Sequence, residues 1–128
     1  MAEILIIEDE AAMAMAISFV LDNAGHTTQT ACDAPSAKKI LATSKIDCAI
    51  CDVWLGNDDG LDLFAKLRSD GVTIPFVIVS GGGPGRTLEA VTTRADMLGA
   101  IGILFKPFGD DELLDVIDIA LNKKSAQH

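Results

Sequence analysis

Aromatic and histidine side chains are scarce in this sequence of 128 residues. It has no tyrosine, one tryptophan and two histidines, His26 and His128. One tryptophan offers little surface for stacking a flavin ring, so a flavin-binding function is disfavoured. Two histidines far apart in the sequence form no cluster for a metal ion or for phosphate relay. The chemistry of the chain must therefore rest on other side chains.

Positive charge is also scarce, with ten lysines and arginines against nineteen aspartates and glutamates, for a net charge of −9. Nucleic-acid binding and binding to an anionic membrane both depend on basic side chains, so both are disfavoured. The longest mostly apolar stretch, 11–21, is interrupted by Ser18 and is too short to span a bilayer. The first ten residues lack the pattern of a signal peptide, and we therefore expect a cytoplasmic protein.

The three cysteines are an odd number, which fits a reducing compartment better than a disulfide framework. Cys48 and Cys51 have the C-x-x-C spacing of redox and zinc sites. However, they lie in the apolar run CAICDV, and residues three apart on a strand point to opposite faces. We therefore expect two buried thiols that act as small apolar side chains.

A glycine-rich stretch, VIVSGGGPGRT at 77–87, follows an apolar run in the manner of a nucleotide phosphate loop. A Walker A loop needs glycine, four residues, and then Gly-Lys-Ser/Thr. Counting from Gly81, the second glycine falls on Arg86, and from Gly82 it falls on Thr87. A dinucleotide-binding loop fails as well, because Gly81-x-Gly83 would need a further glycine at Arg86. The loop must serve another purpose.

Apolar patterns typical of buried strands and of amphipathic helices alternate along the whole chain. The strand-like segments are 3–7, 26–31, 48–53, 75–80 and 101–105, and a helical pattern follows each of them. Strict alternation predicts an α/β fold with a parallel sheet that is covered by helices on both faces. No linker or repeat is present, so we expect one domain over residues 1–122 and a flexible tail over 123–128.

Polar residues stand at the ends of four of these strands: Glu8, Asp9 and Glu10 after the first, Asp52 at the third, Ser80 at the fourth and Lys106 after the fifth. Parallel α/β sheets bind ligands at the carboxyl ends of the strands, so we expect these side chains at one rim. Clustered carboxylates call for a cation, and oxygen ligands with room for water suit Mg²⁺. Lysine and serine are typical partners of phosphoryl oxygens, and a carboxylate such as Asp52 can be phosphorylated as a nucleophile.

The four motifs IIEDE, AICDVWLGNDDG, IVSGG and LFKPF fall in order on four strand ends. Together they resemble the receiver domain of two-component response regulators, and the resemblance covers nearly the whole chain. It implies a flavodoxin-like (βα)5 doubly wound sheet with the strand order 2-1-3-4-5. The chain length fits a receiver that stands alone, without a DNA-binding output domain.

The resemblance assigns roles in phosphoryl chemistry to three residues. It implies that Asp52 is the phosphoacceptor and that Lys106 and Ser80 contact the phosphoryl oxygens. It also implies a cis peptide bond between Lys106 and Pro107.

The same resemblance implies a set of ligands for Mg²⁺. Asp9 and Asp52 would bind the ion directly, and the backbone carbonyl of Trp54 would supply another ligand. Glu8 would act through a water molecule.

The expected switch residues depart from the pattern of the family. Ile103 stands three positions before the site lysine, where the family usually has tyrosine or phenylalanine, so the usual swing of an aromatic ring is not expected. The span between the fourth and fifth strands is also longer than is common, and the surplus lies in the glycine-rich loop. We therefore expect Ser80, Gly81 and Gly82 to carry the switch, through ordering of residues 81–90 around the phosphoryl group.

The expected function is that of a receiver phosphorylated on Asp52, with Mg²⁺, by a histidine kinase or a histidine phosphotransfer protein. It would catalyse only its own phosphorylation and dephosphorylation, and would relay phosphate or switch protein contacts rather than act as a metabolic enzyme. Two other classes remain open. A pseudo-receiver would bind a partner without phosphorylation and without dependence on Mg²⁺. A flavodoxin-like flavin binder would be coloured when purified.

Overall fold

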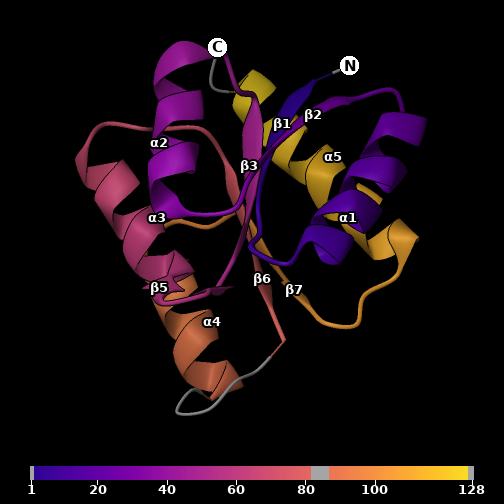
Figure 1. Ribbon diagram of the computed structural model, residues 1–128. Coiled ribbons are helices and arrows are strands. Elements are labelled where there is room, and N and C mark those ends of the chain that lie inside the picture. The colour runs from indigo at the N-terminus through magenta and orange to yellow at the C-terminus, as the bar shows by residue number, and fades with distance from the viewer. Residues whose placement is uncertain (1, 82–86, 127–128) are drawn as a thin grey trace.

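The computed structural model of the protein describes residues 2–81 and 87–126 (Figure 1). Gly82 and the rest of the glycine-rich stretch up to residue 86 lie outside the described residues, as do residues 127–128. The predicted ordering of residues 81–90 around a phosphoryl group therefore concerns a segment of which residues 82–86 lie outside the described residues. Within the described ranges, no helix has the length and apolar character needed to cross a membrane.

The longer strands and the helices alternate in the predicted order. The strands are β1 (Glu3–Ile7), β2 (Thr27–Ala31), β3 (Cys48–Asp52), β4 (Trp54–Leu55), β5 (Asp58–Asp59), β6 (Phe76–Ser80) and β7 (Gly102–Phe105), and the helices are α1 (Ala11–Asn23), α2 (Ala34–Thr43), α3 (Gly60–Ser69), α4 (Leu88–Met97) and α5 (Asp110–Ala126). The longer strands form one parallel sheet of five, in the order β2-β1-β3-β6-β7. Because β6 and β7 are the fourth and fifth of these strands along the chain, the predicted order 2-1-3-4-5 and the flavodoxin-like fold are confirmed.

Helices cover both faces of the sheet (Figure 1). The helices α1 and α5 lie on one face, and α2, α3 and α4 lie on the other. A separate core of buried side chains lies between the sheet and each layer of helices. The core beneath α1 and α5 includes Ile4, Ile17, Leu21, Leu113 and Ile117. The core beneath α2, α3 and α4 includes Leu5, Leu61, Phe64, Leu67 and Val91. The central strand β3 is buried along its whole length, which explains why its sequence is a nearly continuous apolar run.

Cys48 and Cys51 show how side chains alternate along β3. Cys48 packs in the core beneath α1 and α5, whereas Cys51 packs in the core beneath α2, α3 and α4. The two thiols therefore face opposite sides of the sheet, as predicted, and cannot act together as a C-x-x-C site. Burial raises the pKa of the Cys51 thiol, so it stays protonated and unreactive.

Two helix ends show how local sequence sets the element bounds. Oδ1 of Asp33 accepts a hydrogen bond from the N–H of Ser36 at 2.9 Å, and Pro35 lies in the first turn of α2. Both are common features of a helix start. At the other end of the chain, α5 continues to Ala126, beyond the expected end of the folded domain at residue 122.

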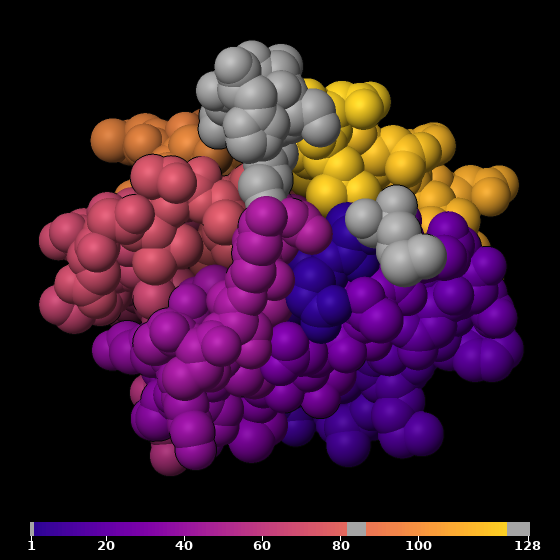
Figure 2. All heavy atoms as spheres, turned by 90° about the horizontal axis from the view of Figure 1, so that it is seen from above, coloured from indigo at the N-terminus to yellow at the C-terminus, as the bar shows by residue number. Residues whose placement is uncertain are grey.

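Figure 2 looks onto the amino-terminal edge of the sheet, where the indigo start of the chain is surrounded by later segments. Glu3 and Asp47 exchange two hydrogen bonds at this edge. The N–H of Glu3 donates to Oδ2 of Asp47 at 2.8 Å, and the N–H of Asp47 donates to the carbonyl oxygen of Glu3 at 2.8 Å. These bonds fix β1 beside β3 at the edge opposite to the predicted site.

A short hairpin after β3 is an element that was not predicted. The strands β4 and β5 pair antiparallel, with Trp54 opposite Asp59. The two-residue turn Gly56-Asn57 joins them, and Gly56 has a φ of 63°, which glycine adopts without strain. The hairpin turns the chain back toward the end of β3, where α3 begins.

Gly60, the first residue of α3, lies against the end of β3 with no room for a side chain. A Cβ at this position would lie 1.8 Å from the carbonyl oxygen of Asp52 and 3.1 Å from Sγ of Cys51. The N–H of Gly60 donates to the carbonyl oxygen of Val53 at 2.7 Å. The first turn of α3 is thus packed directly onto the backbone that carries the Asp52 carboxylate.

We predict that Gly60→Ala lowers the free energy of unfolding by about 2–3 kcal/mol, because backbone atoms must move to admit the methyl group. Gly109→Ala is the matched control, since its Cβ would meet only Oε1 of the flexible Glu112 side chain, at 3.8 Å. Urea unfolding followed by circular dichroism measures both variants. If Gly60→Ala unfolds at the same urea concentration as the wild type, the close approach is not a constraint on the fold.

Candidate functional site

Three buried polar residues mark one edge of the sheet. In the part of the chain that the structure describes, the buried polar or charged residues are Glu8, Asp52 and Ser80, which expose 4%, 3% and 2% of their surface. They stand at or just after the carboxyl ends of β1, β3 and β6, which are neighbouring strands. Burying a carboxylate is costly unless it is paired, so this edge must also hold compensating groups.

Lys106, which follows β7, supplies a positive charge to this edge. Its Nζ donates to Oδ2 of Asp52 at 2.6 Å and lies 3.7 Å from Oε2 of Glu8. The other oxygen of Asp52, Oδ1, accepts a hydrogen bond from the N–H of Trp54 at 2.9 Å. The peptide bond between Lys106 and Pro107 is cis, as the sequence resemblance implies. The structure thus brings together Glu8, Asp52 and Lys106, three of the predicted site residues.

The pKa of the Glu8 carboxyl is raised from its ordinary value of 4.5 to about 8. Burial is the largest cause, and the hydrogen bond with Asp52 and the negative charge of Asp52 add to it. The positive charge of Lys106 and the N–H of Glu10, which donates to Oε1 at 3.2 Å, act in the opposite direction. Glu8 is therefore mostly protonated at neutral pH.

The pKa of Lys106 is raised as well. Burial lowers this pKa, but the hydrogen bond to Asp52 and the nearby carboxylates outweigh burial. Gly81 leaves space for the Lys106 side chain, because a Cβ at Gly81 would lie 3.2 Å from Cδ of Lys106. The first glycine of the glycine-rich stretch thus leaves room for the ammonium group to reach Asp52.

Asp9 is exposed at the outer side of the same edge. Its Oδ2 would lie 3.5 Å from a Cβ at Gly56, so its carboxylate reaches toward the hairpin that follows Asp52. Two carboxylates and the backbone carbonyl of Trp54 are hard oxygen donors, which suit Mg²⁺. In the described part of the chain, however, no three acidic, histidine or cysteine side chains already surround a metal position. The donor chemistry fits Mg²⁺, and Lys106 supplies the positive charge between the carboxylates in this structure.

Ser80 and Ile103, both predicted to take part in the switch, lie on neighbouring strands. The carbonyl oxygen of Ser80 accepts a hydrogen bond from the N–H of Lys106 at 2.9 Å, which fixes the ends of β6 and β7 side by side. Ile103 is the register partner of Ile78 and packs against the core beneath α2, α3 and α4. Its aliphatic side chain has neither a ring nor a hydroxyl group, so it cannot act through the swing of an aromatic ring.

A groove of about 500 Å³ runs from this edge along α1. It begins at Glu8 and Asp9, passes Met15 and Phe19, and is bounded on the other side by residues 30–32. Met15 and Phe19 expose 71% and 69% of their surface. Neither residue belongs to a recognised motif of the sequence. Their signal is that they are large apolar residues that lie outside the buried stripe of α1.

The sheet order and the buried pair of Asp52 and Lys106 at its carboxyl edge define an α/β domain of the flavodoxin-like class with an acidic site at the usual ligand edge. The family of response regulator receiver domains matches residues 4–118. The chain therefore belongs to this family, the phosphoacceptor modules of two-component signalling. Receiver domains generally bind Mg²⁺ at the phosphorylation site, and histidine kinases phosphorylate them.

Individual relatives agree with this assignment. The chain is 31% identical to the transcriptional regulatory protein FixJ of Bradyrhizobium diazoefficiens over 120 residues, which are 94% of this chain and 57% of FixJ. It is 33% identical to the regulatory protein VirG of Rhizobium rhizogenes over 127 residues, which are 97% of this chain and 50% of VirG. The chain thus spans about half the length of these two curated relatives.

A solved structure shows the same fold. The CheY-like receiver domain protein of Methanospirillum hungatei superposes with a TM-score of 0.89 and 21% sequence identity, over 100% of this chain and 99% of that one. At this level of identity, the likeness supports the arrangement of the strands and helices and does not extend to individual side chains.

We predict that the stability of the metal-free protein falls as the pH rises from about 5 to about 8. The pKa of Glu8 in the folded protein, about 8, lies above the ordinary value of 4.5, so folding takes up a proton between these values. The stabilisation from protonated Glu8 is complete below pH 4.5 and is lost as the pH rises through about 8.

Glu8→Gln has nearly the same shape and cannot ionise, so this variant should lose most of that pH dependence. Urea unfolding in EDTA at about pH 5.5 and about pH 8.5 compares the stability of the wild type and of Glu8→Gln across the pH range in which Glu8 loses its proton. An equally steep loss of stability in wild type and Glu8→Gln would show that another group titrates.

Proposed function

We propose that this receiver domain is phosphorylated on Asp52 in a reaction that requires Mg²⁺. The burial of Asp52 at the end of the central strand, with Lys106 Nζ at 2.6 Å, is the observation that supports this proposal most directly. A buried, charge-paired carboxylate at the ligand edge of a parallel sheet is a candidate for chemistry rather than for packing.

The proposed reaction moves a phosphoryl group from a phosphohistidine to Asp52. An oxygen–phosphorus bond forms at one carboxylate oxygen while the nitrogen–phosphorus bond of the donor breaks, and the histidine nitrogen keeps the electron pair and takes up a proton. Lys106, already in contact with Asp52, balances negative charge on the phosphoryl oxygens, and the Ser80 hydroxyl donates a hydrogen bond to them. Attack of water on phosphorus later restores the carboxylate and releases inorganic phosphate.

Mg²⁺, when bound, neutralises charge on the phosphoryl oxygens. Asp9 and Asp52 would bind the ion directly, together with the backbone carbonyl of Trp54. Glu8 would act through a water molecule, to which its side-chain oxygens can hydrogen-bond.

We predict that acetyl phosphate with Mg²⁺ labels the wild-type protein and that Asp52→Asn abolishes this labelling. An acyl phosphate is stable in acid and labile in base, so the label should be lost on treatment with alkali. EDTA should prevent labelling of the wild type. Intact-mass spectrometry measures the addition. Full labelling of Asp52→Asn would place the acceptor elsewhere, and an unlabelled wild type would favour a pseudo-receiver.

The phosphohistidine donor protein would dock along α1. The groove that begins at Glu8 and Asp9 continues along this helix, and Met15 and Phe19 offer exposed apolar surface on it. Apolar surface next to a reactive edge is the expected feature of a protein contact, because each docked donor must bring its phosphohistidine to that edge. A histidine kinase or a histidine phosphotransfer protein would be the donor.

We predict that Phe19→Ala slows transfer from a donor protein about tenfold, the loss typical of a buried aromatic contact. Labelling of the same variant by acetyl phosphate should not change, because a small molecule needs no docking surface. Met97→Ala is the matched control, since Met97 is 82% exposed but lies on α4 at the other face of the sheet. Equal slowing of acetyl phosphate and of the donor protein would show that Phe19 acts on the site itself.

A further inference from the structure

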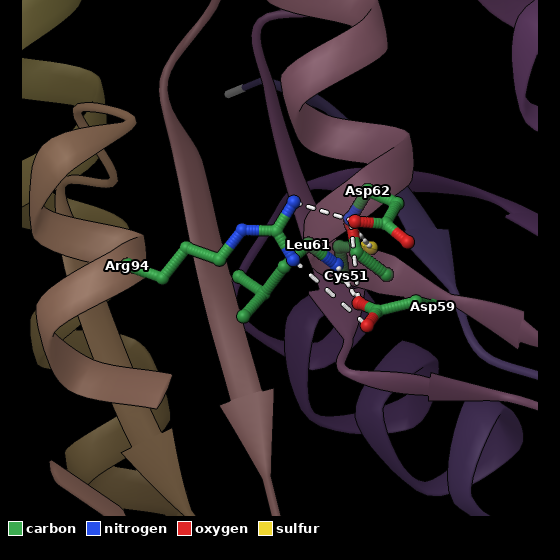
Figure 3. Close-up of polar contacts among 6 residues, drawn as sticks. Cys51, Asp59, Leu61, Asp62 and Arg94 are labelled. Carbon is green, nitrogen blue, oxygen red and sulfur yellow. Dashed lines mark hydrogen bonds and ion pairs between the residues drawn. The ribbon is translucent and has the colours of Figure 1, made fainter. Parts of the chain in front are cut away.

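Arg94, in the last turn of α4, reaches across to the start of α3 (Figure 3). Its Nη2 donates to Oδ1 of Asp62 at 2.5 Å, and its Nη1 lies 3.9 Å from Oδ2 of Asp59. The guanidinium group therefore lies between the carboxylate of Asp59, which precedes α3, and that of Asp62 in the first turn of α3. This ion pair joins two helices that are far apart in the sequence.

Asp59 connects this ion pair with the site. Its Oδ1 accepts hydrogen bonds from the N–H groups of Leu61 at 2.8 Å and Asp62 at 3.3 Å, so the residue that Arg94 approaches is also the cap of α3. In the hairpin, Asp59 is the register partner of Trp54. The N–H of Trp54 in turn donates to Oδ1 of Asp52.

A second route leads from the same turn to the same carboxylate. A Cβ at Gly60, which follows Asp59, would lie 1.8 Å from the carbonyl oxygen of Asp52. Sγ of Cys51 contacts the carbonyl oxygens of both Asp52 and Gly60, at 3.5 and 3.8 Å. The first turn of α3 and the end of β3 are therefore in contact without a gap, and a shift of one moves the other.

We propose that Arg94 is a positioning residue for the metal-binding edge. Through Asp59 and Asp62, it holds the turn between β3 and α3 so that the carbonyl of Trp54 and the carboxylate of Asp52 can bind Mg²⁺ together. This inference rests on the proposed function, since it assigns a purpose to Arg94 only if Mg²⁺ binds at that edge. It also makes α4 a second support of the site, in addition to the strands.

The direction in which the affinity for Mg²⁺ changes on removal of Arg94 distinguishes a positioning role from a purely electrostatic one. Removing the positive charge of Arg94 makes the surroundings of Asp59 and Asp62 more negative, and through space this attracts Mg²⁺ more strongly. Loss of positioning has the opposite result, because the oxygen ligands are no longer held together. A weaker affinity for Mg²⁺ in Arg94→Ala can therefore not come from the lost charge.

The test is Mg²⁺ binding to the wild type, Arg94→Ala, Asp62→Ala and the double variant, followed by fluorescence of Trp54 and by calorimetry. We expect Arg94→Ala to bind Mg²⁺ about three- to fivefold more weakly, the size of effect that a partly exposed ion pair supports. The double variant should bind Mg²⁺ no more weakly than Arg94→Ala, because the loss of Arg94 already breaks its ion pair with Asp62. Simple electrostatics instead predicts that the double variant returns to the affinity of the wild type.

Lys66→Ala is the matched control. It removes the exposed ion pair of Lys66 and Asp70, 3.1 Å apart on α3, which makes no contact between elements. It should leave the affinity for Mg²⁺ within a factor of about two. An equal loss in Lys66→Ala would overturn the proposal, because any charge change on this surface would then have the same effect.

Amide hydrogen exchange in the metal-free protein gives a second readout that needs no ligand. In Arg94→Ala, the N–H groups of Trp54 and Leu61 should exchange faster than in the wild type, while those of the central strand should not change. Unchanged exchange and unchanged affinity for Mg²⁺ in Arg94→Ala would overturn the positioning role. If the wild type itself binds no Mg²⁺, the proposed function fails and the positioning role fails with it.

Discussion

Repulsion between two carboxylates buried on neighbouring strands is the constraint on which the site depends. Glu8 and Asp52 are both almost fully enclosed, and two adjacent negative charges there would destabilise the fold. The structure relieves this repulsion in two ways, with a proton on Glu8 and with the ammonium of Lys106 on Asp52. A cation or phosphoryl group that enters this edge would change the charge that the proton on Glu8 and the ammonium of Lys106 now offset. Binding at this edge is therefore coupled to protons and to the position of one lysine.

The backbone around Asp52 is held from more than one direction. Register with β1 and β6 fixes the strand, whereas the hairpin and the first turn of α3 fix the chain after it. Gly60 permits this arrangement because any side chain would collide with the carbonyl oxygen of Asp52. The site is thus built from the ends of strands and from one tight turn, and the turn determines where the backbone oxygen of Trp54 lies.

The sequence could predict the layers and the strand order because strands buried on both faces leave continuous apolar runs, as in β1 and β3. It also indicated that Glu8, Asp52 and Lys106 would meet, since parallel strands end at one edge. It could not predict the hairpin, whose two-residue strands are too short to show periodicity, although Gly56-Asn57 is a turn signal. The protonation of Glu8 and the pairing of Arg94 with Asp62 depend on burial and on distance in space. No local sequence pattern indicates the protonation of Glu8 or the pairing of Arg94 with Asp62.

The distribution of the three cysteines has a practical consequence. Cys48 and Cys51 are enclosed in separate cores, whereas Cys32 is exposed and lines the groove that begins at Asp9. A thiol-reactive fluorophore or spin label would therefore attach to the folded protein at one position, without the removal of any native cysteine. That position lies in the same groove as Glu8 and Asp9, so the unaltered chain carries its own attachment point for spectroscopic measurements at this edge of the sheet.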